Sequence, residues 1–146
     1  MLCAQIMKRH VHSVDPTETI QSTARRMRDA NVGLMPVCDT AGRVIGVVTD
    51  RDLALRVCAE DVRPSTTEVA EVMTHGAFTC APEDSVERAE AVMRKHQITR
   101  VPIIDGDGCL VGLLSLSDLV FYESSARAGR TLRTVAERKY EPESGP

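Results

Sequence analysis

The sequence predicts a mixed α/β (α+β) fold made of two similar β-α-β-β-α units, and three observations carry this prediction. Residues 46–52, GVVTDRD, and 112–118, GLLSLSD, share one pattern: a glycine, two apolar residues, a hydroxyl residue, two variable residues and an aspartate. The chain overlays itself without a gap at an offset of 66 residues. Each copy also has apolar residues at helical spacing, followed by two short apolar runs around a turn.

The repeat runs from position 7 to position 53, with ten identities over these 47 positions. Most other apolar positions stay apolar in both copies. Two copies are too few for a solenoid, which needs about three or more, so we expect two half-domains related by a pseudo-twofold axis. The identical pairs are Met7/Met73, Pro16/Pro82, Met27/Met93, Arg28/Arg94, Pro36/Pro102, Asp39/Asp105, Gly42/Gly108, Gly46/Gly112, Asp52/Asp118 and Leu53/Leu119.

Each unit is expected to begin with a short strand before its proline, at residues 11–14 and 77–80. A helix comes next, because apolar residues recur at intervals of three and four. In the second copy Asp84, with Glu87 three residues later, fits a capping box at the start of that helix. The apolar helical positions are Ile20, Ala24 and Met27 in the first copy, and Val86, Ala89 and Met93 in the second.

A β-hairpin is expected after each helix, because turns that begin with aspartate and end with glycine suit hairpins. The turn DTAG joins strands at 34–38 and 43–49, and DGDG joins strands at 100–104 and 109–115. Another helix begins after the hydroxyl residue, and in the first copy it is expected to reach about Glu60. Its apolar positions are Leu53, Ala54 and Val57.

The chain divides, in this prediction, into a first repeat at 1–60, a polar linker at 61–66, a second repeat at 67–128 and a helical or disordered tail at 129–146. The linker contains a helix-ending proline. After it, TTEVAEVMT predicts a short helix that matches the start of the chain.

The last helix is expected to run to about Arg127, break near Gly129 and resume through Arg138. The final eight residues, KYEPESGP, are expected to be disordered. This segment is locally basic but has acidic neighbours, which favours a solvated helix over a docking segment for a partner. Its basic residues are Arg127, Arg130, Arg133, Arg138 and Lys139.

Composition points to a cytoplasmic protein that binds neither nucleic acid nor membranes. The net charge of −3 gives no basic field for DNA, RNA or anionic lipid. Two Phe, two Tyr and no Trp argue against a base-stacking surface. No apolar run approaches the ~20 residues that span a bilayer, and the first residues lack the apolar core of a signal peptide.

The cysteines are expected to be buried, reduced thiols, because their number is odd, no two have CxxC spacing and the chain is long enough to bury a core without disulfides. A redox-switch pair stays an alternative. The five cysteines are Cys3, Cys38, Cys58, Cys80 and Cys109.

Two interpretations of the hydroxyl–aspartate pairs, Thr49 with Asp52 and Ser115 with Asp118, stay open at this point. Both fit a helix-capping pattern. Capping boxes favour Glu or Gln, however, and the shorter aspartate suggests that the carboxylate points elsewhere. Free N–H groups at the start of a helix suit phosphate, and a carboxylate can accept hydrogen bonds from both ribose hydroxyls. The second interpretation is therefore a nucleotide site.

The sequence resembles the CBS domain family, named for cystathionine β-synthase. The residues that carry the resemblance are GLMPVCDTAGRVIGVVTDRDL at 33–53 and TRVPIIDGDGCLVGLLSLSDL at 99–119. Proline segments followed by helices ending in Met-Arg support it. The resemblance covers roughly residues 1–125 as a stand-alone tandem pair of the bacterial type. It implies one module packed sheet to sheet, with two clefts between the central sheets, that usually forms homodimers.

In ligand-binding members of this family the clefts take AMP, ADP, ATP, S-adenosylmethionine or NAD. The resemblance implies that Asp52 and Asp118 hold the ribose hydroxyls, and that Thr49 and Ser115 contact phosphate or ribose. It also implies a phosphate contact for Arg100, two residues before a proline.

The first copy has Leu34 at the position of Arg100, so the two clefts are expected to be unequal. The residues that the resemblance places around the base are Leu34, Met35 and Pro36 in one copy, and Val101 and Pro102 in the other.

The predicted function is a non-catalytic regulatory module that binds an adenosine ligand and reports energy or cofactor status through its dimer or a protein partner. No nucleophile triad, Walker motif or GxGxxG loop is present, and no cofactor is expected to be required. His10 and His12 lack further metal ligands at useful spacing, and DGDG lacks the rest of a calcium loop. Replacing Asp52 or Asp118 by alanine is expected to leave the fold intact. The alternatives are a structural or stress-related interaction module with empty clefts, and a detached fragment of an effector protein.

Overall fold

The computed structural model describes residues 1–137, and the chain falls into two compact units. Unit 1 contains Met1–Arg9, Phe78–Ile103 and the described chain from Val111 onward, whereas unit 2 contains His10–Ala77 and Ile104–Leu110. The first nine residues therefore fold with the second repeat. The predicted domain boundaries stay a prediction from the sequence, with ranges 1–60, 61–66, 67–128 and 129–146.

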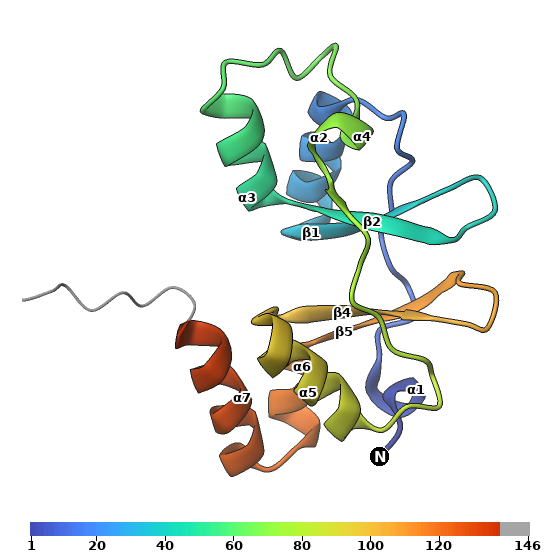
Figure 1. The fold of residues 1–146 in the computed structure, drawn as a ribbon, viewed down its shortest axis with the longest axis vertical. Helices are drawn as coiled ribbons and strands as arrows, with labels where there is room; N and C mark the ends of the chain where they lie inside the picture. Colours follow the sequence, from blue (N-terminus) through green and yellow to red (C-terminus); the bar gives the residue numbers. More distant parts are fainter. Residues whose placement is uncertain (138–146) are drawn as a thin grey trace, which may run out of the picture. The chain divides into compact units, whose positions relative to one another are not determined.

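Unit 2 is built on an antiparallel hairpin of β1 (Leu34–Cys38) and β2 (Val44–Thr49), and the short β3 (Thr74–His75) pairs with β2. In this register Met35 lies opposite Val48. The helices of the unit lie on one face of the hairpin (Figure 1). They are α2 (Ile20–Ala30), α3 (Asp50–Leu53), a π-helical turn η1 (Ala54–Cys58) and α4 (Val69–Val72).

Unit 1 repeats this arrangement around β4 (Arg100–Ile104) and β5 (Leu110–Ser115), although the turn that joins the two strands, Ile104–Leu110, belongs to unit 2. Lys8 forms an antiparallel bridge with Leu113, at the position that Thr74 of β3 takes in unit 2. Helices again cover one face of the hairpin (Figure 1). They are α1 (Cys3–Ile6), α5 (Val86–His96), α6 (Leu116–Tyr122) and α7 (Ser125–Glu137).

The buried stripe of α2 differs from the prediction by one residue. Ile20 and Met27 are buried as expected, but Ala24 is exposed and Thr23 is fully buried. The stripe advances by three and then four residues, which is equally compatible with helical periodicity. The Thr23 hydroxyl is satisfied in the core because it donates to the Thr19 carbonyl at 3.0 Å. In α5 the predicted positions Val86, Ala89 and Met93 are all buried.

The helix predicted to reach Glu60 consists of α3 and η1 and ends at Cys58. Val57 is buried and Leu53 is half-buried, but Ala54 is exposed. Leu53 and Val57 are four residues apart and share one helix face, whereas Ala54 directly follows Leu53 and points away from that face.

The strands predicted at 11–14 and 77–80 are reduced to single parallel bridges. Val14 bridges Val37, and Cys80 bridges Ile103. Each bridge is followed two residues later by a proline, which has no N–H with which to extend the ladder.

Helix α5 begins at Val86 with Ser85 as its N-cap, and the predicted capping box of Asp84 and Glu87 is wrong. The Ser85 side chain accepts a hydrogen bond from the Arg88 N–H at 3.2 Å. Asp84 Oδ2 instead accepts from the Ala81 N–H at 2.8 Å and so closes the preceding turn.

The predicted helix break near Gly129 is also wrong. Helix α6 ends at Tyr122, and α7 runs from Ser125 to Glu137 without interruption through Gly129. The break lies at 123–124, where Glu123 has extended backbone and the Ser124 carbonyl accepts from the Arg127 N–H at 3.0 Å. The predictions for Arg138, Lys139 and the last eight residues lie outside the described residues.

Both predicted hairpin turns are confirmed. Asp39 Oδ1 accepts from the N–H groups of Ala41 and Arg43, both at 2.9 Å, and Gly42 has φ +83°. These bonds, chiefly the one from the Arg43 N–H, hold the pKa of Asp39 below its ordinary value. Asp105 makes the same pair of bonds in the second turn.

Candidate functional site

Both hydroxyl–aspartate pairs form closed capping boxes. The Asp52 N–H donates to Thr49 Oγ1 at 3.1 Å, and the Thr49 N–H donates to Asp52 Oδ2 at 2.9 Å. In unit 1 the same bonds join Asp118 to Ser115 at 3.2 and 2.8 Å. The expectation that aspartate is too short to reach back is therefore wrong.

The helix starts offer fewer free N–H groups than the phosphate interpretation expects. The Asp50 N–H donates to the Gly33 carbonyl at 3.0 Å, the Arg51 N–H to Asp50 Oδ1 at 2.8 Å, and the Asp52 N–H is in the capping box. The first N–H of α6 likewise donates to the Thr99 carbonyl at 2.8 Å. A phosphate group would therefore have to be held mainly by side chains.

Each aspartate keeps its second carboxylate oxygen outside the capping box. Asp52 Oδ1 lies 3.8 Å from Arg56 Nε, and Asp118 Oδ1 lies 3.5 Å from Lys8 Nζ. These distances are longer than those of good hydrogen bonds. Each Oδ1 atom therefore retains capacity to accept a hydrogen bond from a ligand hydroxyl.

Lys8 and Arg56 are the site residues that the sequence analysis missed. Arg56 follows Asp52 by four residues on a helix, a spacing that could have revealed it. Lys8 lies far from Asp118 in the chain, and only the fold brings the two together. The repeat partner of Lys8 is Thr74, so this cation has no counterpart in unit 2.

The two sites also differ in how their polar groups are held. The Ser115 hydroxyl donates to Asp118 Oδ2 at 2.6 Å, and both residues are buried. In unit 2 Thr49 and Asp52 are half-buried. Arg56 is tied there to the backbone, because its guanidinium donates to the carbonyl of Val72 at 2.8 Å.

The residues expected around a base divide between the two faces of their strands. Met35 and Val101 are fully buried in the hydrophobic cores of their own units. Because side chains alternate along a strand, any contact with a base falls to the opposite face. The residues on that face are Leu34 and Pro36 of β1, and Arg100 and Pro102 of β4.

Packing explains the glycine that opens each motif. A Cβ atom at Gly46 would overlap the carbonyl oxygen of Thr74, and one at Gly112 would overlap the sulfur of Met7. Each glycine thus permits the close approach of a neighbouring segment to the hairpin. This part of the repeated pattern needs no ligand.

The cysteines are free thiols in different surroundings. Cys3 and Cys80 are buried as expected, whereas Cys58 is exposed, which corrects the prediction for that residue. Burial raises the pKa of the Cys3 thiol to about 11, and it also raises the pKa of Cys80. The redox-pair alternative stays a prediction. Cys38 and Cys109 are half-buried.

Within residues 1–137, no group of three or more His, Cys, Asp or Glu side chains is placed to hold a metal ion. His10 and His12 are both exposed. In the same part of the chain, no helix combines the length and the apolar character needed to cross a bilayer.

Several known proteins are similar to this chain. The CBS domain-containing protein YhcV of Bacillus subtilis is 40% identical over 131 residues, which cover 89% of this chain and 91% of YhcV. The crystal structure of Hypoxic Response Protein I with two coordinated zinc ions matches with a TM-score of 0.78 and 28% identity, covering 85% of this chain and 100% of that one. A CBS domain protein from Pyrobaculum aerophilum complexed with AMP matches with a TM-score of 0.77 and 27% identity, covering 91% and 99%.

The sequence model of the CBS domain matches residues 3–58 and again residues 69–125, which together make up more than half of the chain. These matches confirm the resemblance drawn from the two motifs, and the structure confirms the mixed α/β fold with two small sheets. The chain therefore belongs to the CBS domain family, as a tandem pair of domains.

Proposed function

We propose that this chain is a non-catalytic regulatory module that binds adenosine-containing ligands through Asp52 in unit 2 and Asp118 in unit 1. The observation that carries the proposal is that the two oxygens of each carboxylate have different partners. Oδ2 caps the helix, and Oδ1 meets only a cation at 3.5 Å or more. An oxygen in this position can accept a hydrogen bond from a ribose hydroxyl.

The class of ligand is supported by the similar Pyrobaculum aerophilum protein, which was solved with AMP. AMP, ADP, ATP, S-adenosylmethionine and NAD all contain the ribose that this arrangement requires. None of them would be a cofactor in the catalytic sense, because the proposed role is regulatory.

The two sites are proposed to bind phosphate with different strength. In unit 1, Lys8 lies beside Asp118, and Arg100 lies on the same strand face as Pro102. In unit 2 the nearby cation, Arg56, is held by backbone carbonyls, and Leu34 replaces the strand arginine. Unit 1 should therefore favour ligands with more phosphate charge.

Regulation would follow from a shift in population, in which the ligand stabilises the arrangement of the module that binds it more tightly. A homodimer would carry the signal. Leu55 and Phe121, which are 66 residues apart and therefore equivalent in the repeat, are 50% and 83% exposed. Exposed apolar residues at both equivalent positions support an interface there, and sedimentation of a Phe121→Glu variant would test it. The cytoplasmic location and the link to energy status stay predictions.

One observation favours a second candidate, an interaction module that binds no nucleotide. The capping boxes alone give Thr49, Asp52, Ser115 and Asp118 a structural role. The experiment must therefore separate capping from ligand binding.

Asparagine achieves this separation, and alanine does not. The amide oxygen of asparagine can accept the hydrogen bond from the capping N–H, whereas its NH₂ group cannot accept a hydrogen bond from a ribose hydroxyl. Alanine removes the cap as well, so it would combine a weakened helix start with a lost ligand contact, and the expectation that Asp52→Ala and Asp118→Ala leave the fold intact stays a prediction.

The test is a thermal-shift panel of AMP, ADP, ATP, S-adenosylmethionine, NAD and a guanosine nucleotide on the wild type and on Asp52→Asn/Asp118→Asn. A ligand at about 100 times its Kd stabilises the protein by about 2.7 kcal/mol. The proposal predicts a shift with at least one adenosine compound, which the variant loses. The matched control is Asp61→Asn/Asp107→Asn, at two exposed aspartates. Absence of any adenosine-dependent shift would leave the interaction module as the better account.

A further inference from the structure

A groove of about 840 Å³ lies in unit 1, where α5 and α7 meet. Helix α7 begins at residue 125, where the match to the CBS domain ends, so one wall of this groove lies outside the matched residues. Four arginines and two glutamates line it, and no aromatic side chain does. The groove therefore favours a hydrophilic anion over a nucleobase.

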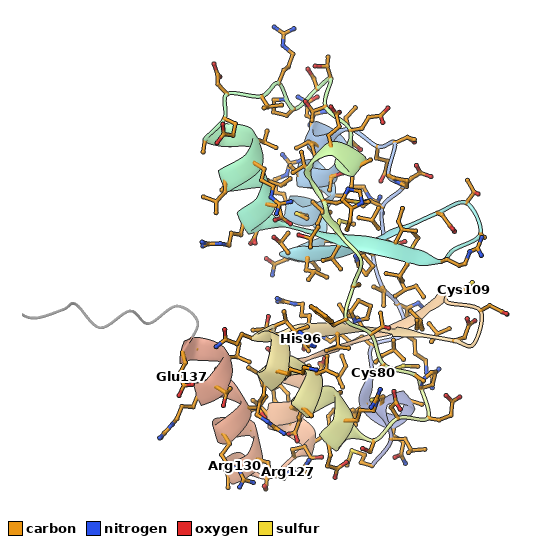
Figure 2. All side chains as sticks on the ribbon, viewed as in Figure 1. Cys80, His96, Cys109, Arg127, Arg130 and Glu137 are labelled. Carbon is orange, nitrogen blue, oxygen red and sulfur yellow. The ribbon has the colours of Figure 1, made fainter. Side chains whose placement is uncertain are left out.

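Arg127 of α7 links this helix to α5, and its positive charge is paired with carboxylates there. Its guanidinium donates to Glu87 Oε1 at 3.2 Å, to Glu123 Oε2 at 2.9 Å and to Glu90 Oε2 at 2.6 Å. Figure 2 places Arg127 near the start of α7. With three carboxylates around it, Arg127 has a structural role and is not the group that attracts an anion.

Glu90 carries an unsatisfied oxygen at this groove. The residue is only 2% exposed, and its Oε2 atom is bound by Arg127. Its Oε1 atom is buried and has no hydrogen-bond partner in the described part of the chain. A buried acceptor without a donor is costly, so a donor from a bound molecule would stabilise it.

Arg130 and Arg133 supply the free positive charge. Both line the groove, and both are exposed. Among residues 1–137 neither guanidinium has an ion-pair or hydrogen-bond partner. Residues three apart lie on the same helix face, and guanidinium groups suit the geometry of a phosphate.

Gly129 has no side chain, so it leaves the helix backbone uncovered beside these arginines. It lines the groove in the interior of α7, where glycine is about 1 kcal/mol less favourable than alanine. A Cβ atom there would meet nothing within 4 Å, and its φ is not positive. Packing within the described chain therefore does not require glycine, whereas a ligand against the helix backbone would.

We propose that this groove binds a small phosphate ester that also carries hydroxyl groups, such as a sugar phosphate. Arg130 and Arg133 bind the phosphate, a hydroxyl group donates to Glu90 Oε1, and the ligand lies against the backbone at Gly129. This site is separate from Asp52 and Asp118 and takes a ligand without a base.

Calorimetric titration of the full chain with glucose 6-phosphate, inorganic phosphate and glucose tests the proposal. We expect glucose 6-phosphate to bind more tightly than phosphate, and glucose not to bind. Arg130→Ala/Arg133→Ala should weaken glucose 6-phosphate binding at least about tenfold, since charge-assisted hydrogen bonds are lost. The matched control is Arg25→Ala/Arg63→Ala, which removes the same charge at exposed positions in unit 2 and should bind normally.

Two further variants test the other contacts. Gly129→Ala should raise the melting temperature and weaken binding, whereas a glycine without a ligand role would raise the melting temperature alone. Glu90→Gln should reduce the preference for glucose 6-phosphate over phosphate. If that variant fails to fold, Gly129→Ala and the double arginine variant still decide the matter.

The proposal is overturned if glucose 6-phosphate does not bind, or if it binds the wild type and Arg130→Ala/Arg133→Ala equally. Asp52→Asn/Asp118→Asn should keep its affinity for glucose 6-phosphate. A failure of the adenosine proposal would therefore be distinguishable from a failure of this one.

Discussion

Replacing Asp118 by alanine should destabilise the protein more than replacing it by asparagine. Asp118 Oδ2 accepts hydrogen bonds from the Ser115 N–H at 2.8 Å and from the Ser115 hydroxyl at 2.6 Å. Ser115 is 8% exposed, so water cannot readily replace the lost acceptor. Asparagine keeps an oxygen at the cap, and alanine does not.

The structure sets the size of this effect. Leaving a buried donor unsatisfied costs about 1–3 kcal/mol. For a chain of this length, that corresponds to a fall in Tm of roughly 3–9 °C. Asp52→Ala removes one such bond, to the half-buried Thr49, so its cost should stay near the usual loss of a helix cap, about 0.5–2 kcal/mol.

The assay is urea unfolding followed by far-ultraviolet circular dichroism for Asp118→Ala, Asp118→Asn and Asp52→Ala. The expected order of stability places Asp118→Ala lowest. If Asp118→Ala and Asp118→Asn unfold at the same urea concentration, the carboxylate contributes nothing through its cap and the argument from hydrogen-bond geometry fails.

Three other outcomes follow from the packing and the caps. Gly46→Ala should destabilise strongly because its Cβ overlaps a backbone carbonyl, whereas Gly106→Ala, with open space around it, should unfold like the wild type in the same urea assay. Ser85→Ala should cost about 0.5–2 kcal/mol because it removes the cap of α5, and a Tm unchanged from the wild type would contradict that assignment. Burial raises the pKa of Cys3 from 9.0 to about 11, so the folded state holds the thiol proton more tightly than the unfolded state does. The stability that this raised pKa contributes is present below pH 9 and is lost as the pH rises through about 11. The free energy of unfolding should therefore fall less steeply over this range in Cys3→Ala than in the wild type, and parallel curves would refute the shift.

Features that depend on neighbouring residues could be predicted from the sequence. The hairpins follow from the bonds that Asp39 makes within its own turn and from the positive φ of Gly42. The helices follow from apolar spacing, although that spacing could not distinguish Thr23 from Ala24 as the buried position. The family itself was predictable because the whole motif occurs twice.

Features that depend on tertiary structure could not be predicted. The cation beside Asp118 is a lysine from the start of the chain, which only the fold brings close. Helix α7 continues through Gly129 because it packs on α5, where Arg127 and Glu90 meet across 37 residues of sequence. Local propensity alone favoured a break at that glycine.

The central claim is that Asp52 and Asp118 hold a ribose while they cap their helices, and calorimetric titration with AMP tests it most directly. The account predicts that AMP binds the wild type and binds Asp52→Asn/Asp118→Asn at least about tenfold more weakly, the loss expected for a charge-assisted hydrogen bond. The variant should melt close to the wild type, because asparagine preserves the caps. Equal affinity for AMP in the two folded proteins would contradict the account.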